Sequence, residues 1–219
     1  MGNEIYRIAI DGPGGAGKST IAKAVASKLG IDYIDTGAMY RAIGYKLAAE
    51  AIDLEDAAAV QEMLDRTDID FVQGTILLDG EDVNDKIRTP EMSVMASKCS
   101  ALPAVREKLV EIQRAMGMRK SVIMDGRDIG TNVLKDAEYK IYLTASAEER
   151  ARRRFDELQA KGEDQSYESV LEDIRARDHS DMTRELNPLR KAEDAVELDT
   201  TGMTIDEVIS RVLEIAGKA

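Results

Sequence analysis

Aromatic side chains, cysteine and long apolar runs are scarce in this sequence, and each scarcity excludes a class of protein. There is no tryptophan, and aromatic residues make up only 4% of the chain, which argues against a nucleic-acid surface built from stacked rings. The single cysteine, Cys99, excludes an internal disulfide. No apolar run approaches the roughly 20 residues of a membrane-spanning helix. Residues 1–11 lack the features of a signal peptide, so we expect a cytoplasmic protein.

Positive charge is also in deficit. The chain has 30 Lys and Arg against 42 Asp and Glu, a formal net charge of -12. Because nucleic-acid backbones attract basic surfaces, this balance argues against a nucleic-acid partner. A chain of 219 residues is long enough for one α/β domain, or for one domain with an insertion. Any phosphate that it binds must lie in a locally basic pocket on an acidic protein.

Five short strand-like segments are separated by stretches with helical patterns. The segments are residues 5–10, 33–34, 121–126, 140–145 and 195–200. Apolar residues recur four apart over 21–29 and mark one face of a helix. Ser146 with Glu149, and Thr204 with Glu207, have the spacing of capping boxes at helix starts. This alternation predicts an α/β fold with a five-stranded parallel sheet flanked by helices.

Two stretches break the alternation. Residues 71–83 have the pattern of a hairpin, with Asp79-Gly80 as its turn, and predict a small antiparallel insert. Residues 150–185 are rich in charge and are interrupted by Gly162, a pattern more typical of a mobile flap than of a core.

The strongest chemical signal is the segment GPGGAGKST at 12–20. It has the Walker A pattern, with four residues between Gly12 and Gly17 and with Lys18 and Ser19 directly after them. Glycines let successive backbone N–H groups surround phosphate oxygens, and the helix that begins near Lys18 adds the positive end of its dipole. We expect a nucleoside triphosphate to bind Gly12, Pro13, Gly14, Gly15, Ala16, Gly17, Lys18, Ser19 and Thr20.

This motif alone does not distinguish a kinase from a GTPase switch or a mechanical ATPase. No Asn-Lys-x-Asp element is present to read guanine, and the chain is short for a motor. Phosphoryl transfer between two anions needs positive charge around both. Arginines outside the motif could supply it: Arg41, Arg88, Arg106, Arg127, Arg150, Arg152, Arg153, Arg154, Arg177 and Arg184.

Further segments resemble one family closely. They are DTGAMYRAI (35–43), IRTPEMS (87–93), LPAVREKL (102–109), DGRDIGTNV (125–133) and RDHSDMTRELNPL (177–189). Together with the Walker A segment, they follow the order found in the bacterial cytidylate kinases, which are P-loop nucleoside monophosphate kinases. The resemblance implies transfer of the γ-phosphoryl group of Mg-ATP to CMP, and to dCMP, giving ADP and CDP or dCDP. ATP and Mg²⁺ are therefore the expected cofactors, and we expect a monomer with no nucleic-acid or membrane partner.

The resemblance also implies a domain organisation. A single kinase domain, 1–219, would have a core of residues 1–55, 101–149 and 186–219. A monophosphate-binding insert is expected at about 56–100, and a lid at about 150–185.

The same resemblance assigns residues to the acceptor. The phosphate of the monophosphate would be held by Arg41, Arg127 and Arg184. The cytosine edge would be read by Thr36, Ser97, Arg106 and Asp128, and the sugar by Arg177 and Asp181.

The metal and the lid complete the expected site. Ser19 and Asp125 would hold Mg²⁺, although Asp125 can equally be read as a turn aspartate at the end of a strand. Arg150 and Arg154, four apart on a helix, would close over the triphosphate, or they belong to a solvated helix face. We expect Lys18, Arg127, Arg184 and Arg154 to act in the transfer itself.

Two other functions stay open at this point. One is a P-loop kinase for a different small acceptor, either another monophosphate or a small metabolite. The other is a nucleotide-dependent binding module that hydrolyses ATP without phosphorylating an acceptor.

Overall fold

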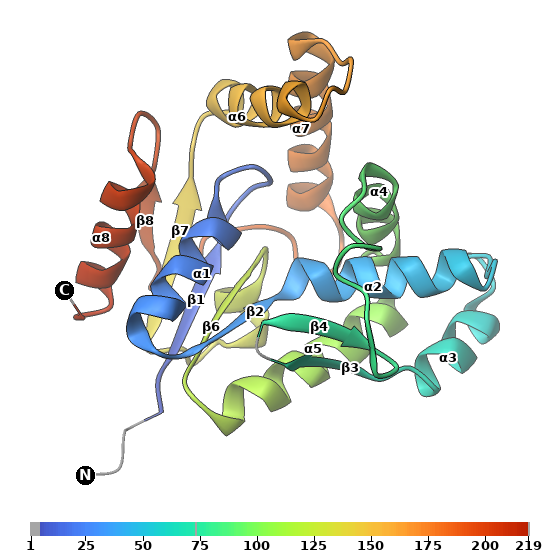
Figure 1. Cartoon of the computed structure of the whole chain (residues 1–219). Coiled ribbons are helices and arrows are strands. Elements are labelled where there is room, and N and C mark those ends of the chain that lie inside the picture. The colour runs from blue at the N-terminus through green and yellow to red at the C-terminus, as the bar shows by residue number, and fades with distance from the viewer. Residues whose placement is uncertain (1–4, 73, 219) are drawn as a thin grey trace. The chain divides into compact units, whose positions relative to one another are not determined.

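The computed structural model describes residues 5–72 and 74–218, and Figure 1 shows its elements. The chain divides into two compact units. One consists of Met1–Ile31 with Val122–Ala219, and we call it the P-loop unit. The other is Asp32–Ser121, which we call the central unit.

Parallel strands form the centre of the P-loop unit. They are β1 (Arg7–Asp11), β6 (Val122–Gly126), β7 (Tyr139–Thr144) and β8 (Val196–Asp199). Strand β1 pairs with β6 on one side and with β7 on the other, and β7 pairs with β8, all in parallel. With β2 (Asp32–Asp35) the sheet has five strands in the order β2-β6-β1-β7-β8, which confirms the predicted five-stranded sheet.

The central strands are apolar because helices cover both faces of a parallel sheet. Ile8, Ala9 and Ile10 of β1 are fully buried, as are Ile123 and Met124 of β6. Such a sheet gathers the carboxyl ends of its strands at one edge, where ligands of α/β proteins bind. Here Asp11, the last residue of β1, lies opposite Gly126, the last residue of β6.

The helices of the P-loop unit are α1 (Lys18–Leu29), α6 (Ala147–Ala160), α7 (Tyr167–Thr183) and α8 (Ile205–Ile215), with a short π-helix η1 (Ile129–Val133). Thr204 and Glu207 form the predicted capping box of α8, and the Ser146 hydroxyl accepts the N–H of Glu149 at the start of α6.

Most of residues 150–185, the stretch predicted to be a charged flap, form helices α6 and α7. Ala151, Leu158 and Val170 are buried together there, with Phe155 and Tyr167 packed against them. This region therefore has a small apolar core of its own.

The central unit combines helices with an antiparallel sheet (Figure 1). Its helices are α2 (Thr36–Ala49), α3 (Ala57–Asp65), α4 (Pro90–Cys99) and α5 (Pro103–Arg119), and its strands are β3 (Ile69–Val72), β4 (Thr75–Leu78) and β5 (Glu81–Asp82). The sheet order is β3-β4-β5. Asp79 and Gly80 join β4 to β5 with φ of 52° and 84°, so the predicted turn and insert sheet are present, with a third strand. No helix in residues 5–72 and 74–218 is long and apolar enough to cross a membrane.

Candidate active site

The loop between β1 and α1 is held close to the sheet. Gly12 has φ of 152°, and a Cβ atom on it would lie 1.9 Å from the carbonyl oxygen of Leu143 in β7. Any side chain at this position would therefore collide with the backbone of β7. Gly17, at the start of α1, has φ of 83°, a left-handed conformation that favours glycine. The glycines of the Walker A pattern are thus required by the path of the chain.

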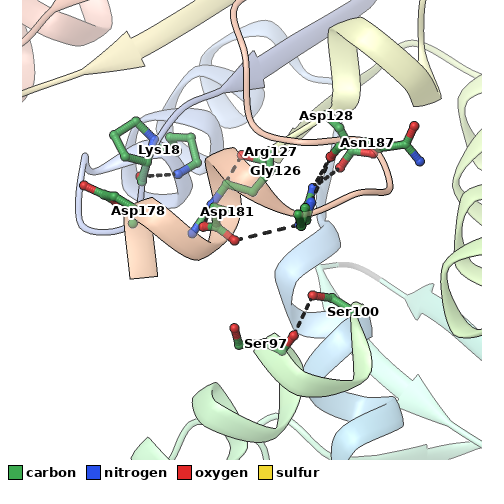
Figure 2. Close-up of polar contacts among 12 residues, drawn as sticks. Lys18, Ser97, Ser100, Gly126, Arg127, Asp128, Asp178, Asp181 and Asn187 are labelled. Atoms are coloured by element: carbon green, nitrogen blue, oxygen red, sulfur yellow. Dashed lines mark hydrogen bonds and ion pairs between the residues drawn. The ribbon is translucent and has the colours of Figure 1, made fainter. Parts of the chain in front are cut away.

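Lys18 is buried inside this loop. Its Nζ donates a hydrogen bond to the carbonyl oxygen of Pro13 at 2.7 Å, as Figure 2 shows. Burial, and next the positive charge of Arg127, lower the pKa of Lys18 to about 7, although carboxylates such as Asp125 oppose the shift. A buried ammonium that has given up its water is poised to gain from a nearby anion.

Ser19 and Asp125 lie within hydrogen-bonding distance. The Ser19 hydroxyl donates to Asp125 Oδ2 at 2.9 Å, which brings the end of β6 to the start of α1. Mg²⁺ in kinases binds hard oxygen atoms from one or two protein groups together with substrate phosphates. A hydroxyl and a carboxylate side by side fit that requirement, so these residues could hold the metal.

A network of arginines and carboxylates lies where β6 ends and α7 ends (Figure 2). Arg127 Nε donates to Asp181 Oδ2 at 2.7 Å. Arg184 approaches the same carboxylate, with Nη1 3.8 Å from Asp181 Oδ1, and its Nη2 lies 3.3 Å from Asp128 Oδ1. The backbone carbonyl of Asn187 accepts two further hydrogen bonds from Arg184.

The charges in this network stabilise one another. Burial alone would raise the pKa of Asp181, but the charge and hydrogen bond of Arg127, together with the charges of Arg177 and Arg184, lower it. Burial acts to lower the pKa of Arg127, but Asp181, together with the charges of Asp125 and Asp178, raises it. Both groups are therefore charged at neutral pH.

The P-loop lies beside these arginines. A Cβ atom on Gly14 would be 3.5 Å from Arg127 Nη2 and 3.7 Å from Arg177 Cδ. The structure thus brings the triphosphate motif and three of the residues predicted for the acceptor, Arg127, Arg177 and Asp181, into one neighbourhood of the P-loop unit.

The two arginines predicted for the lid differ in their surroundings. Arg154 is partly exposed and pairs with Glu157, at 3.3 Å. Arg150 is buried, and Asp178 of α7 accepts two hydrogen bonds from it.

Arg41 and Thr36 are carried by α2 of the central unit. Arg41 Nη2 lies 3.0 Å from Asp35 Oδ2, and Asp35 also caps α2 by accepting the N–H of Ala38 at 2.8 Å. Arg41 Nε is buried without a hydrogen-bond partner among the described residues. Thr36, the first residue of α2, is buried. An unpaired guanidinium N–H is a donor available to an anion.

Ser97 and Arg106 lie on α4 and α5 of the same unit. Arg106 is buried; its Nε donates to the carbonyl of Ser100 at 3.1 Å, and its guanidinium lies 5.5 Å from the ring centre of Tyr40. The Ser100 hydroxyl donates to the carbonyl of Ser97 at 2.9 Å, as Figure 2 shows. The C-terminal end of α4 is therefore tied to Arg106.

A family model described as cytidylate kinase matches residues 8–218. This chain belongs to the cytidylate kinase family. The cytidylate kinase of Caldicellulosiruptor saccharolyticus is 58% identical over 95% of this chain and 94% of its own, and that of Carboxydothermus hydrogenoformans is 53% identical over 97% of each. Among solved structures, an uncharacterised protein from Eubacterium ventriosum is similar in fold, with a TM-score of 0.55 at 13% identity over 99% of this chain and 100% of its own. These relatives confirm the predicted family.

One buried carboxylate of this cytidylate kinase family member was missed in the sequence. Asp11 ends β1, and its two oxygen atoms accept the N–H groups of Ile129 and Gly130, each at 2.7 Å. Burial raises its pKa to about 6, although these hydrogen bonds oppose the shift. Asp11 thereby fixes the segment that follows Arg127 and Asp128. Its place directly before the Walker A glycines was a signal that could have identified it.

Proposed function

We propose that this protein transfers the γ-phosphoryl group of ATP to CMP, and to dCMP, giving ADP and CDP or dCDP. One observation carries the proposal: in the P-loop unit, the triphosphate loop with Lys18 lies beside the network of Arg127, Asp181 and Arg184. A kinase must hold two phosphates close together, and this neighbourhood offers positive charge for both. Membership of the cytidylate kinase family supports ATP as the donor and disfavours another small acceptor.

The donor side depends on Lys18 and the loop glycines. Backbone N–H groups of residues 12–20 would surround the β- and γ-phosphates, and Lys18 would turn from the Pro13 carbonyl to the phosphates. Because Lys18 is already desolvated, its attraction to an anion is stronger than in water. Ser19 and Asp125 would hold Mg²⁺, which neutralises charge on the phosphates when bound.

The acceptor side depends on guanidinium groups. Arg127 and Arg184 are ordered in advance by Asp181 and Asp128, and the buried Nε–H of Arg41 has no hydrogen-bond partner within residues 5–72 and 74–218. Each could donate to the phosphate of CMP. That phosphate oxygen is already ionised, so no general base is needed, and catalysis comes from alignment and charge stabilisation. Arg154 is proposed to add charge to the transferring group.

Base choice is proposed to follow from hydrogen-bond direction. The 4-amino group of cytosine is a donor, whereas N3 and O2 are acceptors. Asp128 can only accept, and Arg106 can only donate. Asp128 can therefore pair with the 4-amino group of cytosine, and Arg106 with N3. Uracil has an acceptor at position 4 and a donor at N3, so both of these pairs would be lost. Ser97 and Thr36 would add hydroxyl contacts to the base, and Arg177 with Asp181 would bind the sugar.

The test is ADP release from Mg-ATP with CMP, dCMP, UMP, AMP, GMP and dTMP supplied in turn. We expect CMP to exceed UMP by roughly 100-fold in kcat/KM, because a mismatched base leaves buried polar groups unpaired. Equal use of CMP and UMP would contradict the base assignment. ATP hydrolysis that needs no acceptor would favour the binding-module alternative instead.

Two further properties are part of the proposal. We propose that the protein acts as a monomer, which light scattering would test, and that it acts in the cytoplasm, which cell fractionation would test.

A further inference from the structure

Arg150, in the first turn of α6, is buried and makes four hydrogen bonds. Its Nε donates to the carbonyl of Ala145 at 3.0 Å, and its Nη1 donates to the carbonyl of Gly14 in the P-loop at 2.9 Å. Asp178 of α7 accepts the other two, at 3.1 Å and 2.6 Å. We propose that Arg150, held by Asp178, is a positioning residue that orients the Gly14–Gly15 peptide of the P-loop for the triphosphate. This inference rests on the proposed use of ATP.

The planarity of the peptide bond makes this contact effective. In a trans peptide the C=O and the following N–H point in opposite directions. When Arg150 holds the Gly14 carbonyl, the N–H of Gly15 must point in the opposite direction within the peptide plane. Two consecutive glycines are the least restrained pair that the chain could have at this point. An external anchor therefore removes freedom that the loop would otherwise lose when it binds phosphates.

The charge of Arg150 is already matched in the protein. The Arg150 and Asp178 side chains are only 5% and 14% exposed, and their closest approach is 2.6 Å. A guanidinium that donates to one carboxylate and two carbonyls is fixed in direction by its planar geometry. By contrast, the Arg154 side chain is 39% exposed and pairs with Glu157 on its own helix. Arg150 thus supplies orientation to the loop, whereas Arg154 has the freedom to reach a ligand.

Helix α7 supports both sides of the reaction in the P-loop unit. Asp178 holds Arg150 and, through it, the P-loop, whereas Asp181, one helical turn later, holds Arg127 beyond β6. Gly15 lies against Arg150 as well, because a Cβ atom on Gly15 would be 3.3 Å from Arg150 Cβ. The position of α7 therefore determines the position of the loop through a short chain of direct contacts.

The test compares Arg150→Lys and Asp178→Asn with the unmodified protein. Lysine cannot reach two carbonyls and a carboxylate at once, and asparagine keeps the shape of Asp178 but loses its charge and one acceptor. We expect the Kd for ATP, measured by calorimetry without an acceptor, to rise about tenfold in each variant. The Kd for CMP should stay within about twofold, and the double variant should lose no more than either single one, because both act through one contact.

Arg7→Lys is the matched control for lost stability. Arg7 is also a mostly buried arginine of the P-loop unit, and it bonds Asp136 and Glu138 at the opposite end of β1. The Arg7→Lys variant should have a lower melting temperature, and the ratio of its ATP affinity to its CMP affinity should be unchanged. If Arg150→Lys or Asp178→Asn also changes only the melting temperature, the pair is merely structural and the proposal is wrong.

A second outcome would overturn the proposal in another way. If Arg150 binds the triphosphate directly, Asp178→Asn would release it and strengthen ATP binding while Arg150→Lys weakens it. A positioning role requires both variants to weaken it. The Kd for ATP is measured without an acceptor. Failure of the unmodified protein to phosphorylate CMP would therefore refute the proposed acceptor without affecting the comparison of ATP affinities.

Discussion

Lys18 of the P-loop unit and Lys46 of the central unit are both buried, and they have different partners. Lys18 in the P-loop unit is 5% exposed and Lys46 in the central unit is 6% exposed. The Lys46 ammonium pairs with the carboxylate of Asp79, next to the turn between β4 and β5. Lys18 instead donates to the neutral carbonyl of Pro13. A buried charge that is matched by a carboxylate serves the fold, whereas one held by a carbonyl is available to a ligand.

Lys18→Met gives the largest effect expected from this comparison. The substitution removes a preorganised charge that would stabilise negative charge at the β–γ bridge of ATP. We expect a loss of at least about 100-fold in kcat. The free energy of unfolding should not fall, because burying the charge already costs stability in the absence of ligand. Steady-state kinetics and thermal unfolding check the two expectations, and a folded variant with near-normal turnover would refute the phosphate-binding role.

Lys46→Met is the matched control for this variant. It makes the same substitution at an equally buried position, but it breaks an ion pair with Asp79. Because the Asp79 side chain is 40% exposed and can be solvated, we expect to lose only about 1 kcal/mol of unfolding free energy. Turnover should stay within about twofold of normal. The opposite result, lost turnover with unchanged stability, would contradict the assignment of Lys46 to the fold and of Lys18 to the ligand.

The fold could be predicted from local patterns. The apolar runs of β1 and β6, the Asp79-Gly80 turn and the capping box of α8 each occupy a few consecutive residues, and each is found in the structure. The apolar core of α6 and α7 was missed. Its buried residues, Ala151, Leu158 and Val170, are widely spaced among charged ones.

The site was predictable only where its chemistry is contiguous. Residues 12–20 form one motif, so the loop and Lys18 were identified directly. The contact of Arg150 with Gly14 joins positions 136 apart, and that of Gly130 with Asp11 joins positions 119 apart. No periodicity or spacing along the chain reports such contacts. These contacts matter because the charged side chains that make them are buried, and burial is known only from the folded structure.

Asp181→Ala tests whether Asp181, one of the carboxylates around Lys18, serves the acceptor rather than the donor. Asp181 raises the pKa of Lys18 weakly, through its charge, but it bonds Arg127 directly. We therefore expect the effect on the acceptor to exceed the effect on the donor. The KM for CMP should rise about tenfold, because Arg127 loses its orientation and the sugar loses a contact.

The KM for ATP is the internal control for Asp181→Ala, and it should stay within about twofold. A larger change in the KM for ATP than in that for CMP would place Asp181 with the donor and contradict the assignment to the sugar and Arg127.

The smallest expected effect is a pH dependence of ATP binding that belongs to Lys18. The pKa of Lys18 is lowered to about 7 in the free protein, chiefly by burial, and bound phosphates would raise it again. Lys18 is therefore charged below pH 7, where affinity is full, and loses its charge as the pH rises above 7, where binding must take up a proton. If bound ATP keeps Lys18 protonated, the affinity at pH 8 should be about fivefold lower than at pH 7.

Lys18→Arg is the control, because a guanidinium stays charged throughout this range. The titration of ATP itself is common to both proteins and cancels in the ratio of their affinities. Calorimetry in two buffers of different ionisation enthalpy would show the proton uptake directly at pH 8 in the unmodified protein. An equal slope in both proteins would show that Lys18 keeps its proton without ATP, because the Pro13 carbonyl and nearby carboxylates then stabilise its charge enough to offset burial.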